Sequence, residues 1–177
     1  MKFFSIALLV ATVAVSGCAF KTSPYGASVN NVEAIRSTGI NQISVGKFQS
    51  AKPGLSSITC RAAGPVTVEP SFEAYIEQAL IAELKLAGVY NQAAKLTITG
   101  KLEEVDFSSG MTDGNWLFIL RISNSRNESF STRSTLKFSG SFIADRACAD
   151  VAQAFLPAVQ NLIQDVIRNP KFKQLAS

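Results

Sequence analysis

The segment from Lys95 to Phe142 constrains the fold more than any other part of the chain, because most of it has the pattern of long β-strands. Apolar and polar residues alternate over residues 95–102 and again over residues 130–142, as they do in a strand that buries only one face. Residues 116–122, between these runs, are continuously apolar. Turn-forming residues separate the three runs. The pattern predicts three consecutive strands that pair antiparallel.

The first of these strands changes parity at Glu103 and Glu104. Before this point the apolar residues have even numbers, as Leu102 does, and after it they have odd numbers, as Val105 and Phe107 do. One extra residue in a strand produces such a shift, so we expect a β-bulge here.

Two further segments have the periodicity of amphipathic helices. Residues 70–87 place apolar side chains at helical spacing and are followed by Gly88, a typical helix stop. Residues 145–168 repeat the pattern, and Pro157 within them should kink or split the helix. With a first strand over residues 40–48, the order is β-α-β-β-β-α. We predict an α+β fold in which both helices pack on one face of an antiparallel sheet.

The beginning of the chain has the pattern of an export signal. Lys2 precedes an apolar run from Phe3 to Val15, which is shorter than the roughly 20 apolar residues of a transmembrane helix. Small residues follow the run. Residues 1–17 are therefore predicted to be a cleaved signal peptide, and the alternatives are an uncleaved anchor or cleavage at another position.

The four residues Val15-Ser16-Gly17-Cys18 resemble the lipobox of bacterial lipoproteins. The resemblance implies that Cys18 becomes the mature amino terminus and carries fatty acyl chains such as palmitate. Two or more acyl chains anchor a protein stably, whereas one does so only marginally. Ala19, in place of an Asp, implies sorting to the outer membrane, and we expect the protein to face the periplasm. The implied partner of Cys18 is thus the membrane itself.

Residues 19–39 are polar and rich in small residues, including Pro24 and Gly26. With Cys18 they are predicted to form a flexible tether, which would span on the order of 25 Å. Residues 40–177 should then fold as a single α+β domain.

Residues 49–69 form a long irregular segment, in which residues 57–60 are a candidate short strand. Segments of this length are usually functional or fastened to the domain. Cys60 lies in it, and Cys148 lies in the second predicted helix. An exported chain with two remaining cysteines favours a disulfide between them, and the alternative is two separate buried thiols.

The residue types present disfavour an enzyme. The chain contains no His, which excludes Ser-His-Asp and Cys-His catalysis and leaves a zinc site short of ligands. Ser134 and Lys137 have the Ser-x-x-Lys spacing of penicillin-recognising enzymes, but on a strand they point to opposite faces. An acidic cluster at residues 103, 104 and 106 is expected to divide between the two faces in the same way. We therefore predict no enzymatic activity, no metal and no cofactor.

Charge does not indicate a nucleic-acid partner. The formal net charge is +4, and the 17 Lys and Arg residues are scattered along the chain. Nucleic-acid binding requires a basic patch or stripe, so we expect no such partner.

The strand over residues 116–122 provides the candidate binding surface. If its even-numbered residues face the helices, Leu117 and Ile119 must face away from them. These two side chains either lie beneath the 49–69 segment or form an apolar patch for a partner protein, a second copy or an acyl chain.

In its element order and lipid anchor the chain resembles small α+β lipoproteins that assist envelope assembly or transport. We therefore interpret it as a non-catalytic, lipid-anchored binding or assembly module of the cell envelope, with an unidentified envelope protein as partner. The alternative is a lipid-handling auxiliary of an envelope transport system.

Overall fold

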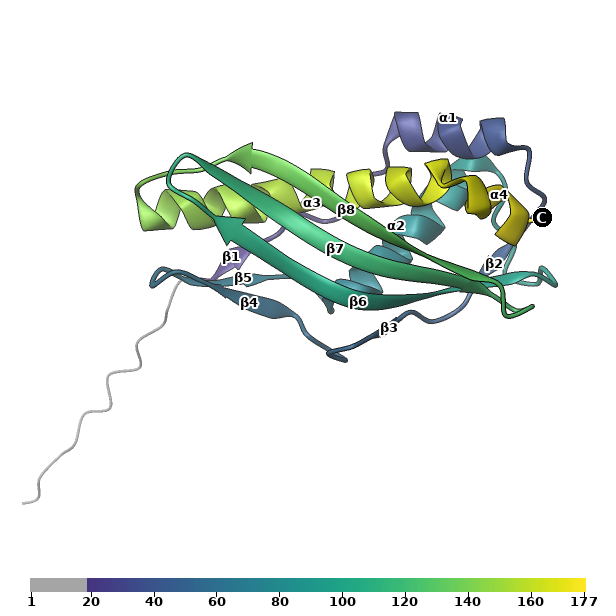
Figure 1. Ribbon diagram of the computed structural model, residues 1–177, viewed down its shortest axis with the longest axis horizontal. Helices are drawn as coiled ribbons and strands as arrows, with labels where there is room; N and C mark the ends of the chain where they lie inside the picture. Colours follow the sequence, from purple (N-terminus) through teal and green to yellow (C-terminus); the bar gives the residue numbers. More distant parts are fainter. Residues whose placement is uncertain (1–18) are drawn as a thin grey trace, which may run out of the picture.

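A computed structural model describes residues 19–177 of the chain (Figure 1). The predicted signal peptide (residues 1–17) and the predicted lipidation site at Cys18 lie outside the described residues.

The main sheet is built on three long antiparallel strands, as predicted. They are β6 (Thr97–Ser109), β7 (Asp113–Asn124) and β8 (Ser129–Ser139), with β7 in the middle. The register between β6 and β7 shifts between Leu102 and Glu104, which confirms the bulge. The shift keeps Leu102, Val105 and Phe107 directed toward one face.

The predicted first strand over residues 40–48 is reduced to one short strand. Within the predicted range lies β2 (Ser44–Val45), and β3 (Gln49–Ser50) follows just beyond it; both pair parallel to β6. The strand order is β2-β6-β7-β8, with β3 also on β6. The sheet is therefore mixed at this edge, because the chain reaches β6 only after crossing over through a helix.

Four helices occur in the described residues, and the long ones pack on one face of the sheet (Figure 1). This confirms the α+β arrangement. The predicted helix at residues 145–168 runs continuously through Pro157, so the proline does not split it. Gln153, whose carbonyl the proline cannot pair, is exposed to water. The helices are α1 (Val29–Thr38), α2 (Phe72–Ala87), α3 (Ala144–Arg168) and α4 (Pro170–Leu175).

An aromatic cluster fills the space between the sheet and the helices. Trp116 of β7 is fully buried, and its indole N–H donates to the Val151 carbonyl in α3 at 2.9 Å. Phe155 of α3 lies with its ring centroid 5.0 Å from that of Trp116 and 5.6 Å from that of Phe72 in α2. The predicted inward residues of β7, from Trp116 to Ile122, are all buried.

A second, three-stranded sheet lies beside the helices. It consists of β1 (Phe20–Lys21), β5 (Gly64–Thr67) and β4 (Ser57–Cys60), in the order β1-β5-β4. The candidate strand at residues 57–60 is therefore present. β1 pairs parallel to β5, and β4 pairs antiparallel to it.

The structure corrects the prediction of a flexible tether over residues 19–39. These residues contain β1 and α1, and α1 packs against α2 and α3. Val32 and Ile35, which lie one turn apart on α1, are buried against the core. The segment is polar on average, but its few apolar residues are spaced so that one helix face is covered.

Candidate functional site: the outer face of the main sheet

The main sheet has one covered face and one open face. The helices pack on the face that carries Trp116 and Phe118, and no other element of the described residues lies over the opposite face (Figure 1). On β8 every outward residue is exposed, from Ser129 to Ser139. We call this open face the outer face.

Leu117 and Ile119 lie at the centre of the outer face and are partly buried. Leu117 stands between Asp106 of β6 and Thr135 of β8, and Ile119 stands between Glu104 and Arg133. Neighbouring polar side chains shield the two apolar ones in part without covering them.

The 49–69 segment does not cover these two residues. It lies on the helix side, where the Leu55 carbonyl accepts the Phe72 N–H at 3.0 Å and Cys60 is bonded to Cys148 of α3. Its residues Leu55 and Ile58 line a hollow at the edge of β6 together with Val105 and the neighbouring carboxylates. These contacts favour the alternative in which the two residues form an apolar patch.

Next to Leu117 and Ile119 the charges on the two flanking strands differ in sign. Glu103, Glu104 and Asp106 lie along β6, whereas Arg133 and Lys137 lie along β8. The apolar pair is thus flanked by acidic residues of β6 and basic residues of β8, while Lys101 and Arg121, further along the same face, add basic groups on β6 and β7.

The bulge changes the expected geometry of the acidic cluster. The carboxylate of Glu103 accepts the Arg121 Nε–H of β7 at 2.8 Å, which brings it to the outer face together with Glu104. The expectation that these two adjacent residues divide between the faces is therefore corrected. An ion pair holds Glu103 in place, as is common on an exposed strand.

Of the two residues with Ser-x-x-Lys spacing, only Ser134 packs against a helix. Ser134 faces α3, where its hydroxyl donates to Asp165 Oδ2 at 2.6 Å and accepts the Asn161 amide at 2.9 Å. Lys137 is exposed on the outer face. The prediction that Ser134 and Lys137 point to opposite faces of the sheet is confirmed. The hydrogen bonds among Ser134, Asn161 and Asp165 join β8 to α3.

The structure contains the predicted disulfide between Cys60 and Cys148. It connects β4 to α3, and both residues are fully buried. Among residues 19–177 no group of three or more His, Cys, Asp or Glu side chains is placed to hold a metal ion.

Sequence reasoning missed three carboxylates of α2 that accept backbone N–H groups. Glu73 accepts from Gly54 at 2.8 Å, and Glu77 accepts from Phe48 at 2.6 Å. Both therefore fix the loop that precedes the small sheet to α2. An open groove of about 880 Å³ lies between this loop and the first half of α2. Their spacing of four residues was visible in the sequence, but it suggested only a solvent-facing helix surface.

The third carboxylate, Glu83, is fully buried beneath the start of α1. Its Oε1 accepts the Tyr25 hydroxyl at 2.6 Å and the Ser28 N–H at 2.8 Å. Burial, followed by the hydrogen bond to Glu83, raises the pKa of Tyr25 well above its usual range. Glu83 therefore takes the place of a side-chain cap for α1, because Ser28 itself provides none.

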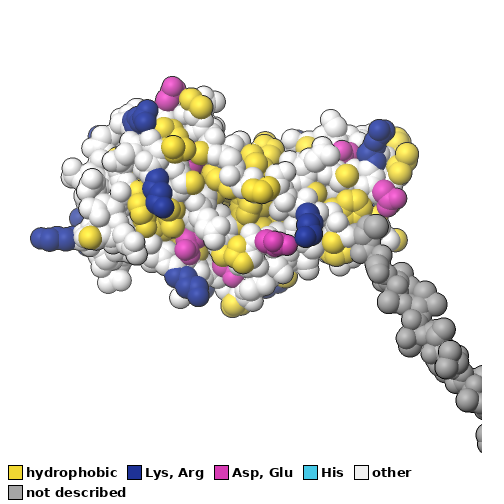
Figure 2. All heavy atoms as spheres, turned by 180° about the vertical axis from the view of Figure 1, so that it is seen from behind, with side chains coloured by type: hydrophobic (Ala, Val, Ile, Leu, Met, Phe, Trp, Pro, Cys, Tyr) yellow, Lys and Arg dark blue, Asp and Glu magenta, His cyan; other side chains and the backbone are white. Residues whose placement is uncertain are grey.

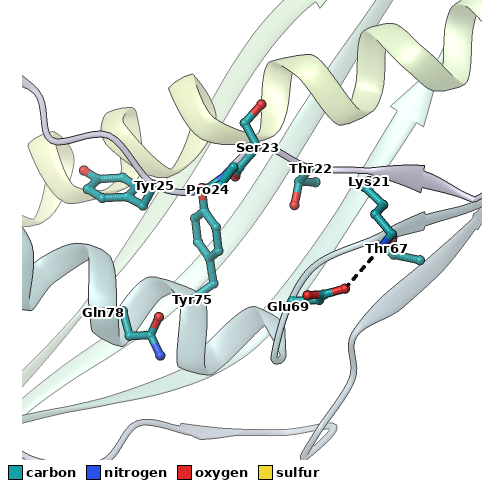
Figure 3. Close-up of a pocket in the computed structure, with 9 residues that line it drawn as sticks. All are labelled: Lys21, Thr22, Ser23, Pro24, Tyr25, Thr67, Glu69, Tyr75 and Gln78. Atoms are coloured by element: carbon teal, nitrogen blue, oxygen red, sulfur yellow. Dashed lines mark hydrogen bonds and ion pairs between the residues drawn. The ribbon is translucent and has the colours of Figure 1, made fainter.

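A cleft of about 400 Å³ lies between residues 21–25 and the first half of α2 (Figure 3). Tyr75 points from α2 toward the segment, and its hydroxyl donates to the Ser23 carbonyl at 2.9 Å. Burial raises the pKa of Tyr75 to about 12. At the other end of the cleft Lys21 meets Glu69 at 3.5 Å. These contacts hold the segment to the domain, and the cleft brings together no reactive pair.

No helix within residues 19–177 has both the length and the apolarity needed to cross a membrane. No family model matches the chain, and no curated protein matches it.

Several solved structures are similar in fold at low identity. A protein from Xanthomonas campestris of the DUF330 family has a TM-score of 0.49 and 13% identity, covering 85% of this chain and 94% of its own. A hypothetical protein from Chlamydia trachomatis has a TM-score of 0.45 and 10% identity, covering 76% and 98%. A candidate lipoprotein from Caulobacter crescentus CB15 has a TM-score of 0.36 and 11% identity, covering 78% and 90%. Likenesses at this level assign no function to this chain.

Proposed function

We propose that this protein is a lipid-anchored, non-catalytic binding module of the bacterial envelope. Acyl chains on Cys18 hold it to the outer membrane on the periplasmic side, and the outer face of the main sheet binds a partner protein. The observation that carries the binding role is the uncovered centre of that face, where Leu117 and Ile119 are partly buried between rows of opposite charge.

The two faces of the sheet suit different tasks. The inner face is held by the aromatic cluster, by the disulfide and by the bonds from Ser134 to α3, so it has little freedom to rearrange. The outer face is rigid and already exposed, so a partner can dock without reorganising the domain. Preorganised surfaces bind with a smaller entropy cost.

The charge pattern indicates what kind of partner fits. A complementary surface has apolar side chains opposite Leu117 and Ile119, basic groups opposite β6 and acidic groups opposite β8. Buried apolar contacts at the centre would supply most of the affinity, and the flanking charges would fix the orientation. A second copy also meets this requirement when it is rotated by 180° about an axis parallel to the strands.

The lipid-handling alternative has less support. An acyl chain requires an apolar cavity. The groove of about 880 Å³ is open to solvent, and the charged side chains of Lys47, Glu73 and Glu77 line it beside apolar ones such as Phe48 and Pro70.

The test combines a double substitution with crosslinking in intact cells. A photo-crosslinking residue replaces Thr135, which is exposed next to Leu117. In this background Leu117→Ser with Ile119→Ser should abolish the crosslinked product, while the free energy of unfolding falls by about 1 kcal/mol or less, as at other partly exposed sites. Immunoblotting and urea unfolding measure the two effects.

The matched control is Val29→Ser with Leu86→Ser, which removes two exposed apolar side chains elsewhere on the surface. The crosslink should persist in this variant. Cys18→Ser should move the protein from the membrane fraction to the soluble fraction. The proposal fails if the outer-face variant keeps its crosslink, or if the crosslinked species is a phospholipid, which would favour the lipid-handling alternative.

A further inference from the structure

The chain is fixed to the domain from its first described residues. Phe20 pairs with Val66 in the small sheet, and the Thr22 N–H donates to the Thr67 carbonyl at 3.0 Å. Figure 3 shows the residues that follow lying across the first half of α2. There is thus no free segment between residue 20 and the folded body.

This geometry limits the distance between the domain and a lipid on Cys18. Consecutive residues span at most about 3.6 Å each, so the backbone of Phe20 lies within about 7 Å of the backbone of Cys18. If Cys18 is lipidated, as the proposed function holds, the part of the domain around the start of β1 must rest against the bilayer.

The pairing of β1 identifies which part of the domain this is. Because β1 and β5 are parallel, β1 begins at the turn between β4 and β5, residues 61–63. Arg61 in this turn donates from Nε to the Ser109 carbonyl at 3.0 Å and from Nη1 to the Ser141 carbonyl at 3.1 Å. Three connecting segments therefore meet at one end of the molecule, which we call the turn end: residues 61–63, 109–113 and 140–143.

The turn end exposes large apolar side chains. Met111 is 61% exposed, Phe142 is 76% exposed and Ile143 is 62% exposed. They account for three of the five strongly exposed large apolar residues among residues 19–177. Figure 1 shows the chain entering the domain at this end, with the carboxyl terminus at the opposite end.

The backbone that carries these side chains is tightly packed. The Gly140 N–H donates to the Thr112 carbonyl at 3.0 Å, and a Cβ at Gly140 would overlap the carbonyl of Gly110. Apolar side chains on a closely packed backbone cannot withdraw from water by local collapse. Their exposure is therefore a stable property of this end.

Charges near the turn end have both signs, because Asp113, Asp145 and Arg146 are all exposed. Figure 2 shows acidic and basic side chains together near the end of the molecule at which the described chain begins. Such a mixture does not select anionic lipid. The end suits apolar insertion into the interface of a bilayer regardless of headgroup charge.

We propose that Met111, Phe142 and Ile143 insert into the bilayer interface next to the lipid anchor. The domain is thereby seated on its turn end, with the long axis of the main sheet directed away from the membrane. In this orientation the outer face stands upright, where a partner in the periplasm can reach it.

The experiment uses the full lipidated protein reconstituted in phosphatidylcholine vesicles. In the Phe142→Trp variant, the fluorescence added above the Trp116 background should be quenched about twofold or more by brominated phospholipid, because interfacial side chains lie roughly 5–10 Å deep. Replacing part of the lipid by phosphatidylglycerol should leave the quenching unchanged.

The matched control is Leu86→Trp, which places a second tryptophan at an exposed site near the end of α2. Its added fluorescence should be insensitive to the brominated lipid. Vesicle flotation tests the lipid anchor separately from the insertion of the turn end. Protein that does not float contradicts the lipid anchor. Protein that floats with an unquenched Phe142→Trp signal, or with equal quenching at both sites, overturns the seating and leaves the anchor in place.

Discussion

Glu83 shows how a single buried carboxylate can hold a segment distant in sequence. It accepts the Tyr25 hydroxyl and the Ser28 N–H, and the Asn31 amide lies 3.4 Å away. A buried carboxylate is costly unless hydrogen bonds compensate for its lost hydration. The residues that provide this compensation, all at Oε1, are those that precede and begin α1, while Oε2 has no partner among the described residues. The segment that leads into α1 and the Glu83 side chain of α2 therefore stabilise each other.

Tyr25→Phe should lower the free energy of unfolding by about 1–3 kcal/mol, since it removes a donor from a buried carboxylate. The effect should shrink above pH 10. The pKa of the Tyr25 phenol is raised in the folded state, so its contribution is complete below the unfolded value of about 10 and is lost as the pH rises further. Urea unfolding at pH 7 and at pH 10.5 measures both effects.

Tyr90→Phe is the control for this substitution. The Tyr90 ring lies 5.3 Å from the Lys85 ammonium, and its hydroxyl forms no side-chain hydrogen bond among the described residues. Its stability should be close to that of the wild type at both pH values. Equal losses in the two variants would contradict the role given to Glu83.

At the scale of elements, the helices begin in different ways. Ser71 caps α2 in the usual manner, because its hydroxyl accepts the Ala74 N–H at 3.3 Å. Ser28 occupies the same position before α1 but forms no side-chain cap. The first helix relies instead on a carboxylate from its neighbour. This explains why the sequence predicted α2 well and missed α1, whose stabilising partner lies 55 residues away.

Ser71→Ala should therefore lower the free energy of unfolding by about 1 kcal/mol, the usual cost of losing a capping hydroxyl. Ser28→Ala should have almost no effect. Thermal and urea unfolding of the two variants provide the comparison, and a similar cost for both would show that the two serines cap alike.

At the scale of the whole molecule, the disulfide joins the small sheet to the longest helix. Cys60 and Cys148 are separated by 88 residues, and the three long strands of the main sheet lie between them in sequence. A link across so long a loop restricts the unfolded chain strongly. The small sheet has little core of its own, so this bond also determines where it sits.

Replacing both cysteines by alanine should lower the free energy of unfolding by about 4–5 kcal/mol on the chain-entropy account. Dithiothreitol should destabilise the wild type by a similar amount and leave the double variant unaffected. Equal urea midpoints for oxidised and reduced wild type would contradict this expectation.

The sequence alone predicted the elements whose stabilising contacts are local or periodic. The alternation of β6 and β8, the apolar run of β7, the bulge at Glu103 and the helix ended by Gly88 are all present in the structure. The cysteine pair could also be proposed, because only two remain beside Cys18. The apolar pair Leu117 and Ile119 followed from strand parity.

Only the tertiary structure decided the features that depend on partners far away in sequence. Residues 19–39 are polar on average, so their folding depends on Glu83 and Tyr75, which no local pattern connects to them. Which face of the main sheet the helices cover, and where the 49–69 segment packs, also depend on contacts between segments that are far apart in sequence. Local periodicity reports which side of an element is buried, whereas the identity of what buries it is set by contacts between distant segments.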